Sequence, residues 1–379
     1  MHFAFAIVSL FPGGGLQRDC IDIAHRVKKL GHDVTIFTSR LSGGAFAKDL
    51  TVRVLRNDMN TNHRRQRAFS DDFSKAAAEG FDLLVGFDKL AGLDLLYCSD
   101  RSICARTASH PLLRILPRYR EFIRLEKECF APTQATKILL LSESQLNEYW
   151  RAWMTQPSRL VMLPPTLVVK RRRPECRTNG AREKLRVSLD LSPSDWVWIA
   201  IGVQPRTKGI DRSIRALKQF PNAHLLIVGL DEEEPRSTGI RRLARKLGVA
   251  DQIKWLGHRE DIPELMAAAD IFIHPARYDT TGTVILESIV NGLPTIVTSV
   301  CGYAKHVSSA DSGIIIPEPF RQKLLVTALE TARDPVLREH WTDSGREYGK
   351  HRSLYEGKAR ATEMIVAGAQ KSNETRSRT

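Results

Sequence analysis

The sequence has no long apolar run and few cysteines. Its longest apolar stretches, such as residues 2–11 and 196–203, fall far short of the ~20 residues that a membrane-spanning helix needs. The six cysteines form no C-x-x-C pair and lie mostly among apolar residues, which argues against both a disulfide framework and a zinc site. The N-terminus lacks the basic segment of a signal peptide and passes from its apolar stretch straight into Pro12-Gly13-Gly14-Gly15, so we expect a cytoplasmic protein.

The sequence also has fewer acidic than basic residues. The 57 Lys and Arg residues outnumber the 43 Asp and Glu residues and give a formal net charge of +14, which suggests partners that carry phosphate: nucleic acid, anionic lipid or nucleotide. The sequence shows neither aromatic stacking platforms nor a nucleic-acid-binding motif, so nucleic acid is not an expected partner. With 379 residues the chain is too long for one ordinary core, which predicts two domains.

Short runs rich in Val, Ile, Leu and Phe alternate with segments of helical character, and this alternation occurs twice along the chain. It predicts the α/β fold class, with two doubly wound parallel sheets that are buried on both faces. The predicted strands are 3–10, 34–38, 52–56, 83–87, 138–141 and 160–163 in the first half, and 196–202, 225–229, 253–257, 271–275, 295–298 and 313–317 in the second.

A break in this pattern separates the two halves. Pro164-Pro165 and the basic run 170–173 lie between them and are typical of an interdomain linker. The predicted divisions are an N-terminal Rossmann-like domain (1–165), a linker (166–180), a second Rossmann-like domain (181–350), a C-terminal helix (351–368) and a disordered tail (369–379). Two such domains that face each other place the carboxyl ends of both sheets at an interdomain cleft, where ligands of open α/β folds bind.

The first turn of the first half is rich in glycine. Gly13-Gly14-Gly15 follows a predicted strand and precedes a predicted helix, so its backbone N–H groups and the helix dipole can receive a phosphate or an oxyanion. The loop lacks the spacing of a dinucleotide fingerprint, no Walker-type run occurs in the sequence, and a plain tight turn is the alternative. Asp19 follows within one helical turn and points either toward the cleft or, as a surface residue, toward solvent.

Charged residues follow two strands of the second half. Arg206 and Lys208 lie in a loop after the first of these strands and suit a diphosphate, with solvated loop charges as the alternative. Further along, the segment from Asp279 to Glu287 runs into a predicted helix. Its two acids suit sugar and ribose hydroxyls, and the amides at the helix start suit phosphates, with a simple capped helix as the alternative.

These motifs together resemble a known enzyme family. The acid, seven residues, acid pattern from Asp279 to Glu287, the loop that ends in Lys208-Gly209 and the glycine-rich first loop are similar to those of the retaining GT-B glycosyltransferases of family four. Further segments resemble the bacterial lipopolysaccharide core glucosyltransferases that act on inner-core heptose, and they are 14–19, 61–63, 264–270 and 300–304. The resemblance extends over the chain up to its tail.

The resemblance implies a GT-B fold in which the N-terminal domain lies on the acceptor side and the second domain binds the nucleotide sugar. The implied reaction moves a hexose, glucose or a related one, with retention from a UDP-sugar to a heptose of the lipopolysaccharide inner core. The implied donor-binding residues are Arg206 and Lys208 at the diphosphate, Arg259 near the uracil, Glu287 at the ribose, and Asp279, Gly282, Thr283 and Val284 at the hexose. Asp19, Gly14 and Gly15 meet the acceptor and the reacting centre. Asp279 stands where the family usually has glutamate, so the hexose is left open.

No Asp-x-Asp triad occurs in the sequence, which removes the usual carboxylate clamp for a divalent metal at a nucleotide sugar. We therefore expect neither a metal nor another cofactor, because a helix N-terminus and basic side chains can stabilise the leaving diphosphate instead. Two other functions stay open. One is a GT-B transferase for another glycan or lipid acceptor, and the other is a nucleotide-sugar epimerase, which needs no acceptor.

A further candidate site lies in residues 111–130, where apolar and basic positions recur near helical spacing. A basic amphipathic surface of this kind can lie on anionic lipid, and a helix packed on the sheet with a solvated basic face is the alternative. The candidates for membrane contact are Arg114, Arg118, Tyr119, Arg120, Phe122 and Arg124. Because similar proteins attach to the inner membrane, where their lipid acceptor lies, the resemblance implies a peripheral protein on its cytoplasmic face.

Overall fold

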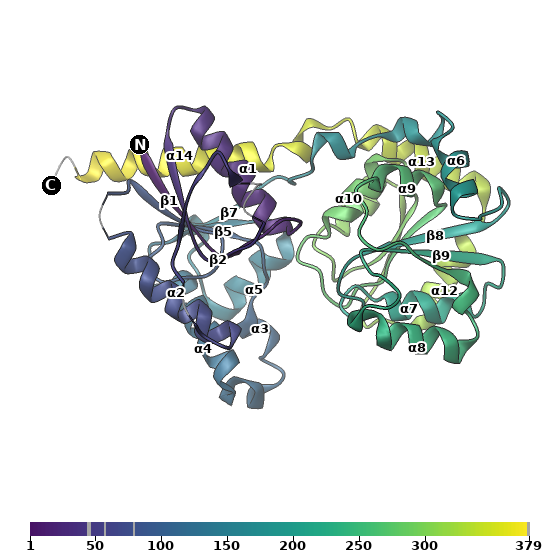
Figure 1. Cartoon of the computed structure of the whole chain (residues 1–379), viewed down its shortest axis with the longest axis horizontal. Coiled ribbons are helices and arrows are strands. Elements are labelled where there is room, and N and C mark those ends of the chain that lie inside the picture. Colours follow the sequence, from purple (N-terminus) through teal and green to yellow (C-terminus); the bar gives the residue numbers. More distant parts are fainter. Residues whose placement is uncertain (44–46, 57, 79, 377–379) are drawn as a thin grey trace. The chain divides into compact units, whose positions relative to one another are not determined.

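The structure is a computed structural model that describes residues 1–43, 47–56, 58–78 and 80–376. The chain divides into two compact units (Figure 1). The first unit contains residues 1–165 and the C-terminal segment from Glu356, and the second contains Thr166–Tyr355. Each unit is a doubly wound parallel sheet covered by helices, which confirms the predicted fold class for each half of the chain.

The first unit has a seven-stranded sheet in the order β3-β2-β1-β4-β5-β6-β7. Its strands are β1 (His2–Leu10), β2 (Asp33–Leu41), β3 (Thr51–Val54), β4 (Leu83–Gly86), β5 (Leu95–Cys98), β6 (Lys137–Leu140) and β7 (Leu160–Met162). Its helices are α1 (Gly15–Lys29), α2 (Asn62–Ala76), α3 (Ile103–Arg106), α4 (Pro117–Phe130), α5 (Glu143–Trp153) and α14 (Gly357–Arg376), with 3-10 turns η2 (Pro111–Ile115) and η3 (Pro157–Arg159). Strand β5 is absent from the sequence-based prediction.

The second unit has a six-stranded sheet in the order β10-β9-β8-β11-β12-β13. Its strands are β8 (Trp196–Ile201), β9 (Ala223–Val228), β10 (Ile253–Trp255), β11 (Ile271–His274), β12 (Thr295–Thr298) and β13 (Gly313–Ile316), all within or close to predicted runs. Its helices are α6 (Ala181–Ser188), α7 (Ile210–Leu217), α8 (Thr238–Leu247), α9 (Ile262–Ala268), α10 (Thr283–Val290), α11 (Lys305–Ser309), α12 (Gln322–Thr331) and α13 (Pro335–Tyr348). The 3-10 turns are η4 (Val169–Arg171), η5 (Pro174–Arg177), η6 (Pro235–Ser237), η7 (Ala250–Gln252) and η8 (Arg352–Tyr355).

Each sheet has an apolar core on both faces. In β1, Phe3 and Phe5 belong to one buried cluster, whereas Ala4 and Ala6 between them belong to another. The central strand β8 alternates in the same way between two clusters of the second unit. Because successive side chains of a strand point to opposite faces, this alternation gives strands that are apolar throughout and buried on both sides.

The expected linker 166–180 belongs instead to the second unit. The Cys176 side chain is buried there, and the backbone N–H of Arg173 donates to Asn291 Oδ1 at 2.6 Å. The Arg177 guanidinium donates to the carbonyl oxygens of Met266 and Ala269 near the end of α9, each at 3.2 Å. The segment is therefore held by polar contacts that its basic composition does not reveal.

The expected tail is also different, because α14 continues to Arg376. Its buried residues Ala361, Ile365 and Ala369 recur every four positions and join the core of the first unit. Asn373 Nδ2 still donates to Asp82 Oδ1 at 2.6 Å, well past the predicted end of the helix at residue 368. Among the described residues, each helix is either too short or too polar to span a bilayer.

Candidate active site

The second unit gathers two ionisable side chains, Lys208 and His274, around the carboxylate of Asp279. Lys208 lies in the loop after β8, His274 is the last residue of β11, and Asp279 precedes α10. Lys208 Nζ donates to Asp279 Oδ2 at 2.6 Å, and His274 Nε2 lies 2.9 Å from the same oxygen. His274 and Asp279 are both buried. Parallel strands bring their carboxyl ends to one edge of the sheet, which explains how residues so far apart in sequence meet here.

Asp279 is ionised in this environment. Burial raises the pKa of its carboxyl group, but the hydrogen bond from His274 and the charge of Lys208 more than offset this and hold the pKa at about 2. An ionised carboxylate only accepts hydrogen bonds, so we assign the ring hydrogen of His274 to Nε2. The carboxylate is thus held by two donors and keeps its other oxygen for further hydrogen bonds.

The start of α10 lies beside this carboxylate. Gly282 precedes the helix with φ +77°, and a Cβ atom at this position would stand 2.7 Å from Ile285 Cδ1 and 3.3 Å from Asp279 Oδ2. Glycine is therefore favoured both by the left-handed backbone and by the lack of space. Thr283 and Val284 form the first turn, where helix N–H groups have no partner within the helix and can receive an anion.

The remaining predicted donor residues are less closely grouped. Glu287 lies one turn further along α10. The Arg259 side chain is hydrogen-bonded to Asp261 within its own loop. The Arg206 side chain is exposed and lines a groove of about 540 Å³ with residues of α7 and α8, such as Arg215 and Arg242. The structure thus brings Lys208, Asp279 and the start of α10 together and does not bring the Arg206 side chain to them.

His274 is a member of this cluster that the sequence analysis did not single out. The only signal for it is a histidine at the last position of a buried strand, at the sheet edge where ligands bind. His274, Asp279 and Cys301 together are the one group of possible metal ligands that the described residues contain, with their ligand atoms within 4.8 Å of one another. The positive charge next to the Asp279 carboxylate is the ammonium group of Lys208, which donates to it.

In the first unit, the glycine-rich loop leads into the N-terminus of α1. Gly14 is the residue that precedes the helix, and no side chain caps the first turn. A Cβ atom at Gly15 would meet no atom within 4 Å, so the loop is open at this point. Its free N–H groups and the dipole of a 15-residue helix can receive an oxyanion, as predicted from the sequence.

Asp19 is held by two partners that lie far from it in sequence. The Tyr97 hydroxyl of β5 donates to Asp19 Oδ2 at 2.9 Å, and Lys358 Nζ of α14 lies 2.9 Å from Asp19 Oδ1. Lys358 also pairs with Asp22, one turn further along α1. The Asp19 side chain is 17% exposed, so it is neither a free surface acid nor a fully buried one. Its contact with an acceptor stays a prediction.

A second carboxylate of the first unit lies near the start of α1. Asp88 lines a pocket of about 320 Å³ together with Leu16 and Lys89. Burial raises the pKa of Asp88 to about 6, although the hydrogen bond from the backbone N–H of Val8 at 2.7 Å opposes this shift. Asp88 was not predicted from the sequence, since a lone Asp after a strand carries no distinctive pattern.

The predicted membrane segment is not one continuous helix. The 3-10 turn η2 precedes α4, whose buried residues Leu125, Cys129 and Phe130 pack into the first unit. Two of the predicted cations are engaged within the protein, because Arg114 donates to the carbonyl oxygen of Cys104 at 2.7 Å and Arg124 donates to Glu121 at 2.7 Å.

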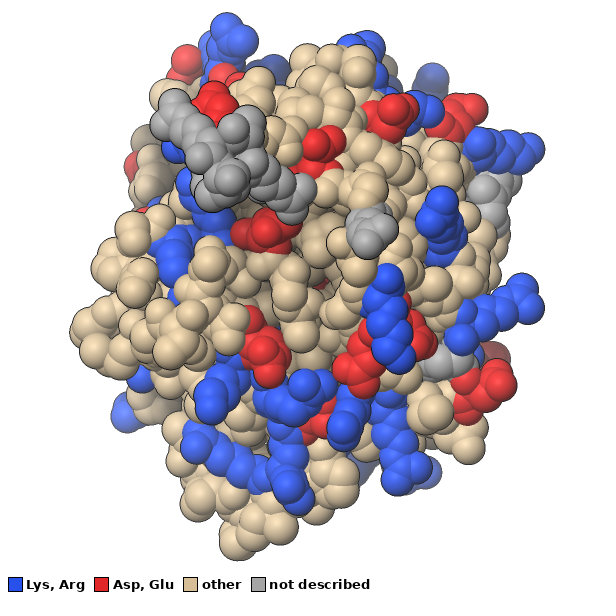
Figure 2. All heavy atoms as spheres, turned by 90° about the vertical axis from the view of Figure 1, so that its left-hand side faces the viewer, with Lys and Arg blue, Asp and Glu red and all other residues tan. Residues whose placement is uncertain are grey.

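The other two predicted cations, Arg118 and Arg120, are exposed. The apolar residues next to them are exposed as well: Leu112 (77%), Ile115 (68%) and Leu116 (49%). Tyr119 and Phe122 are half-buried, and the Arg118 guanidinium lies over the Phe122 ring at 5.8 Å. Figure 2 shows the first unit from this side, with Lys and Arg side chains gathered in the lower half of the view. The free basic surface is therefore smaller than predicted and has an apolar tip.

Comparisons with known proteins identify the family to which this chain belongs. The family model described as "Glycosyl transferases group 1" matches residues 181–348, which is most of the second unit. The lipopolysaccharide glucosyltransferase WaaG of Escherichia coli (strain K12) is 34% identical over 377 residues, which cover 97% of this chain and 99% of WaaG.

Solved structures give the same result. The crystal structure of WaaG, a glycosyltransferase involved in lipopolysaccharide biosynthesis, has a TM-score of 0.88 and 33% identity over 96% of this chain and 99% of its own. The Anabaena protein Alr3699/HepE, solved with UDP-glucose, has a TM-score of 0.70 and 20% identity over 100% of both chains, and it shows the shared fold. The chain belongs to the group 1 glycosyltransferases of the GT-B fold, family four, as its combined motifs indicated.

Proposed function

We propose that this glycosyltransferase is a lipopolysaccharide core glucosyltransferase that moves a hexose from a UDP-sugar to an inner-core heptose, with retention and without a metal. The observation that carries the donor assignment is the cluster of Lys208, Asp279 and the start of α10 within the region matched by the family model. Similarity to WaaG over nearly the whole chain supports the acceptor, and the UDP-glucose complex of a protein with this fold supports the donor.

The donor contacts follow from the chemistry of the cluster. Lys208 and the amides of Thr283 and Val284 bind the diphosphate, because an ammonium and a helix N-terminus both favour phosphate. Asp279 accepts hydrogen bonds from the hexose hydroxyls, and Glu287 accepts those of the ribose. The same donors stabilise the charge that develops on the diphosphate as it leaves, which is the part a divalent metal plays at other nucleotide-sugar sites.

The transfer step needs no protein nucleophile in this scheme. The acceptor hydroxyl attacks the anomeric carbon on the face from which the diphosphate leaves, the bond to the phosphate oxygen breaks, and the departing phosphate takes the proton. The first unit supplies the acceptor side, where the open amides near Gly14 and Gly15 and the carboxylate of Asp19 lie close to the incoming sugar. Preorganised dipoles of this kind act without rearrangement during the reaction.

The exposed tip at η2 and the start of α4 supports a peripheral place on the cytoplasmic face of the inner membrane. Arg118 and Arg120 attract anionic headgroups, while Leu112 and Ile115 enter the interface between headgroups and acyl chains. Such a surface adsorbs reversibly and brings the enzyme to a lipid-bound acceptor.

The deciding experiment uses core oligosaccharide from a strain that lacks this protein as the acceptor. Purified enzyme with UDP-glucose should add one hexose to it, detected by mass spectrometry, and the new linkage should be α by NMR. Conversion of the UDP-sugar in the absence of acceptor would instead support an epimerase. Transfer should also survive excess EDTA, and a loss that Mg²⁺ or Mn²⁺ restores would refute the metal-free scheme.

A further inference from the structure

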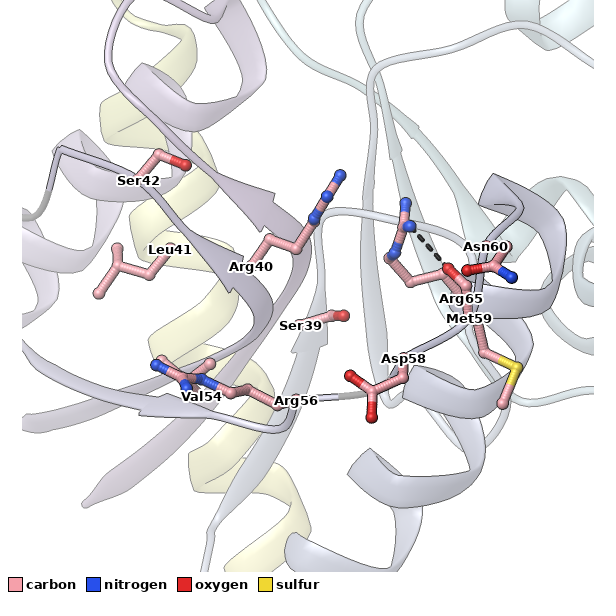
Figure 3. Close-up of a pocket in the computed structure, with 10 residues that line it drawn as sticks. All are labelled: Ser39, Arg40, Leu41, Ser42, Val54, Arg56, Asp58, Met59, Asn60 and Arg65. Carbon is pink, nitrogen blue, oxygen red and sulfur yellow. Dashed lines mark hydrogen bonds between the residues drawn. The ribbon is translucent and has the colours of Figure 1, made fainter.

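One pocket of the first unit belongs to neither the donor cluster nor the membrane surface. It has a volume of about 750 Å³ and opens at the carboxyl ends of β2 and β3, where the chain turns into α2 (Figure 3). Ligands of doubly wound sheets bind outside the carboxyl ends of the strands, so this position is one where the fold favours a ligand.

Three arginines line this pocket, against a single acid. Arg40 lies near the end of β2, Arg56 lies shortly after β3, and Arg65 lies in the first turn of α2. Arg40 and Arg56 are exposed, and within the part of the chain that the structure describes no hydrogen bond or ion pair engages their guanidinium groups. In Figure 3, the Arg40 and Arg65 side chains extend to the same side of the pocket, whereas the Arg56 side chain runs the other way, beside Val54. Free guanidinium groups that share a pocket favour an anionic ligand with planar oxygens, such as a carboxylate or a phosphate.

Arg65 is fixed in place before any ligand binds. Its Nη1 donates to Asn62 Oδ1 at 3.1 Å, and its Nη2 donates to the carbonyl oxygen of Met59 at 2.7 Å (Figure 3). These bonds hold the loop before α2 and the guanidinium together, so a ligand that binds it meets a donor whose orientation is already set.

The rest of the lining suits a sugar. Leu41, Val54 and Met59 are among the large apolar residues of the chain that stay exposed, with exposed fractions of 39%, 37% and 41%. Apolar side chains of this kind can cover the C–H face of a sugar ring, and the carboxylate of Asp58 can accept its hydroxyls. An inorganic anion would contact only the arginines, whereas an acidic sugar contacts the arginines, the apolar side chains and the Asp58 carboxylate.

The pocket also adjoins the glycine-rich loop. Leu41 of β2 is in register with Leu10 of β1, and the N–H of Ser42 donates to the carbonyl oxygen of Leu10 at 2.9 Å. The loop that carries Gly14 and Gly15 begins directly after Leu10. Since neighbouring strands lie about 4.8 Å apart, the pocket wall and this loop are immediate neighbours within the first unit.

We propose that this pocket binds an acidic sugar residue of the acceptor, through its carboxylate or phosphate group, next to the residue that receives the hexose. The proposal rests on the proposed function, since it places the acceptor on the first unit. It makes Arg40 and Arg56 specificity-determining residues that select an anionic core oligosaccharide over a neutral glycan.

The test compares the wild type with the double variant Arg40→Gln/Arg56→Gln, and with Arg64→Gln as a matched control, because Arg64 is exposed on α2 but does not line the pocket. Steady-state transfer is measured with three acceptors: the core oligosaccharide, the same oligosaccharide after phosphatase treatment, and the same after reduction of its carboxyl groups. With the native acceptor, we expect the double variant to raise the KM for acceptor at least tenfold while kcat and the KM for the UDP-sugar stay within twofold, and the control to match the wild type.

The treated acceptors identify the anionic group. Loss of the difference between wild type and double variant after phosphatase treatment assigns a phosphate, and its loss after carboxyl reduction assigns a carboxylate. An unchanged KM in the double variant with the native acceptor overturns the proposal. So does a difference that persists with both treated acceptors.

If the wild type transfers no hexose to this acceptor, the proposed function is refuted, and the pocket must be tested separately. A binding experiment provides that test. Inorganic phosphate and glucuronate are titrated separately into wild type, double variant and control by calorimetry at low salt. Binding of glucuronate that is tighter than that of phosphate, and that the double variant loses, supports an acidic-sugar pocket. Binding of phosphate alone, if the double variant loses it and the control keeps it, supports a pocket for a phosphorylated sugar. Equal binding by wild type and double variant, or binding of neither anion by the wild type, overturns the proposal.

Discussion

The two units share one architecture but arrange their charges in opposite ways. In the second unit, Asp279 is buried and already holds Lys208 and His274 within 3 Å. In the first unit, Arg40 and Arg56 stand exposed at the pocket next to the glycine-rich loop. Buried and paired charges keep their geometry without a ligand, whereas exposed guanidinium groups are ordered only when a ligand arrives. The comparison suggests a donor site that is built in advance and an acceptor site that is completed by the acceptor.

The largest effect is expected at Asp19. If this carboxylate meets the acceptor at the reacting centre, Asp19→Ala should lower kcat by roughly a hundredfold or more, while the affinity for UDP stays near normal, because the lost contact acts in the transition state. Single-turnover transfer and calorimetric UDP titration measure the two quantities.

The matched control is Asp22→Ala. Asp22 also pairs with Lys358 but lies one turn further from the loop. If both variants lose activity equally, the role of Asp19 is to hold α14, and the acceptor contact is wrong.

The pH dependence of stability should separate the donor cluster from the rest of the chain. The folded-state pKa of Asp279 is about 2, below its usual 3.8, so its ionised form stabilises the fold above pH 4 and this contribution disappears as the pH falls from about 4 to 2. The difference amounts to roughly 2 kcal/mol of unfolding free energy.

Urea unfolding of the wild type and of Asp279→Asn between pH 2 and 5 measures this contribution. The stability advantage of the wild type should shrink as the pH falls. A constant advantage over this range would mean that the carboxylate is not held ionised by Lys208 and His274.

A smaller effect is expected on the affinity for UDP, which should differ between variants of Lys208 or Glu287 and a variant of Arg206. Lys208→Ala and Glu287→Ala should each weaken UDP binding about tenfold or more, since each removes a charge-assisted contact of ~1.5–3 kcal/mol. Arg206→Ala should have less effect, because its side chain lies in the groove along α7 and α8. Calorimetry on the three folded variants decides the order, and a loss at Arg206 equal to that at Lys208 would show that the loop rearranges around the diphosphate.

The smallest effect concerns the basic surface of the first unit. Arg118→Gln/Arg120→Gln should reduce binding to anionic vesicles by roughly fivefold at low salt, because each exposed cation contributes about 1 kcal/mol at most. Arg114→Gln/Arg124→Gln is the matched control, since these two guanidinium groups are engaged within the protein. Cosedimentation across a salt series tests this, and equal binding by the two double variants would remove the membrane role from Arg118 and Arg120.

Much of the fold was predictable because parallel strands buried on both faces are continuous apolar runs. In the second unit, the central strands β8 and β11 follow that rule, and all six strands lie within or close to predicted runs. Strand β5 was missed, although Gly92 and Asp94 precede it, because its apolar run is only four residues long, and Tyr97, the partner of Asp19, was missed with it. The helical end of α14 was missed because its buried positions are few and small, apart from Ile365.

The candidate site was predictable where a motif fixes the residues and unpredictable where folding brings them together. Asp279, Gly282 and Lys208 follow from spacing and resemblance, and they do meet. His274 needed the structure, because a single histidine at a strand end is common. Arg206 shows the opposite case, since a favourable place in the sequence did not bring its side chain to the cluster.

The place of α14 in the sequence determines when the first unit can be completed during synthesis. Residues 1–165 of the first unit leave the ribosome before the second unit, but α14 of the same unit leaves after it and supplies Ala361 and Ile365 to the core and Lys358 to Asp19. The second unit, in contrast, is a continuous insert that can fold while synthesis is still under way. A chain that stops short of residue 356 therefore leaves the first unit with an unfilled core face and Asp19 without its lysine partner, so that the first unit is complete only in chains that include α14.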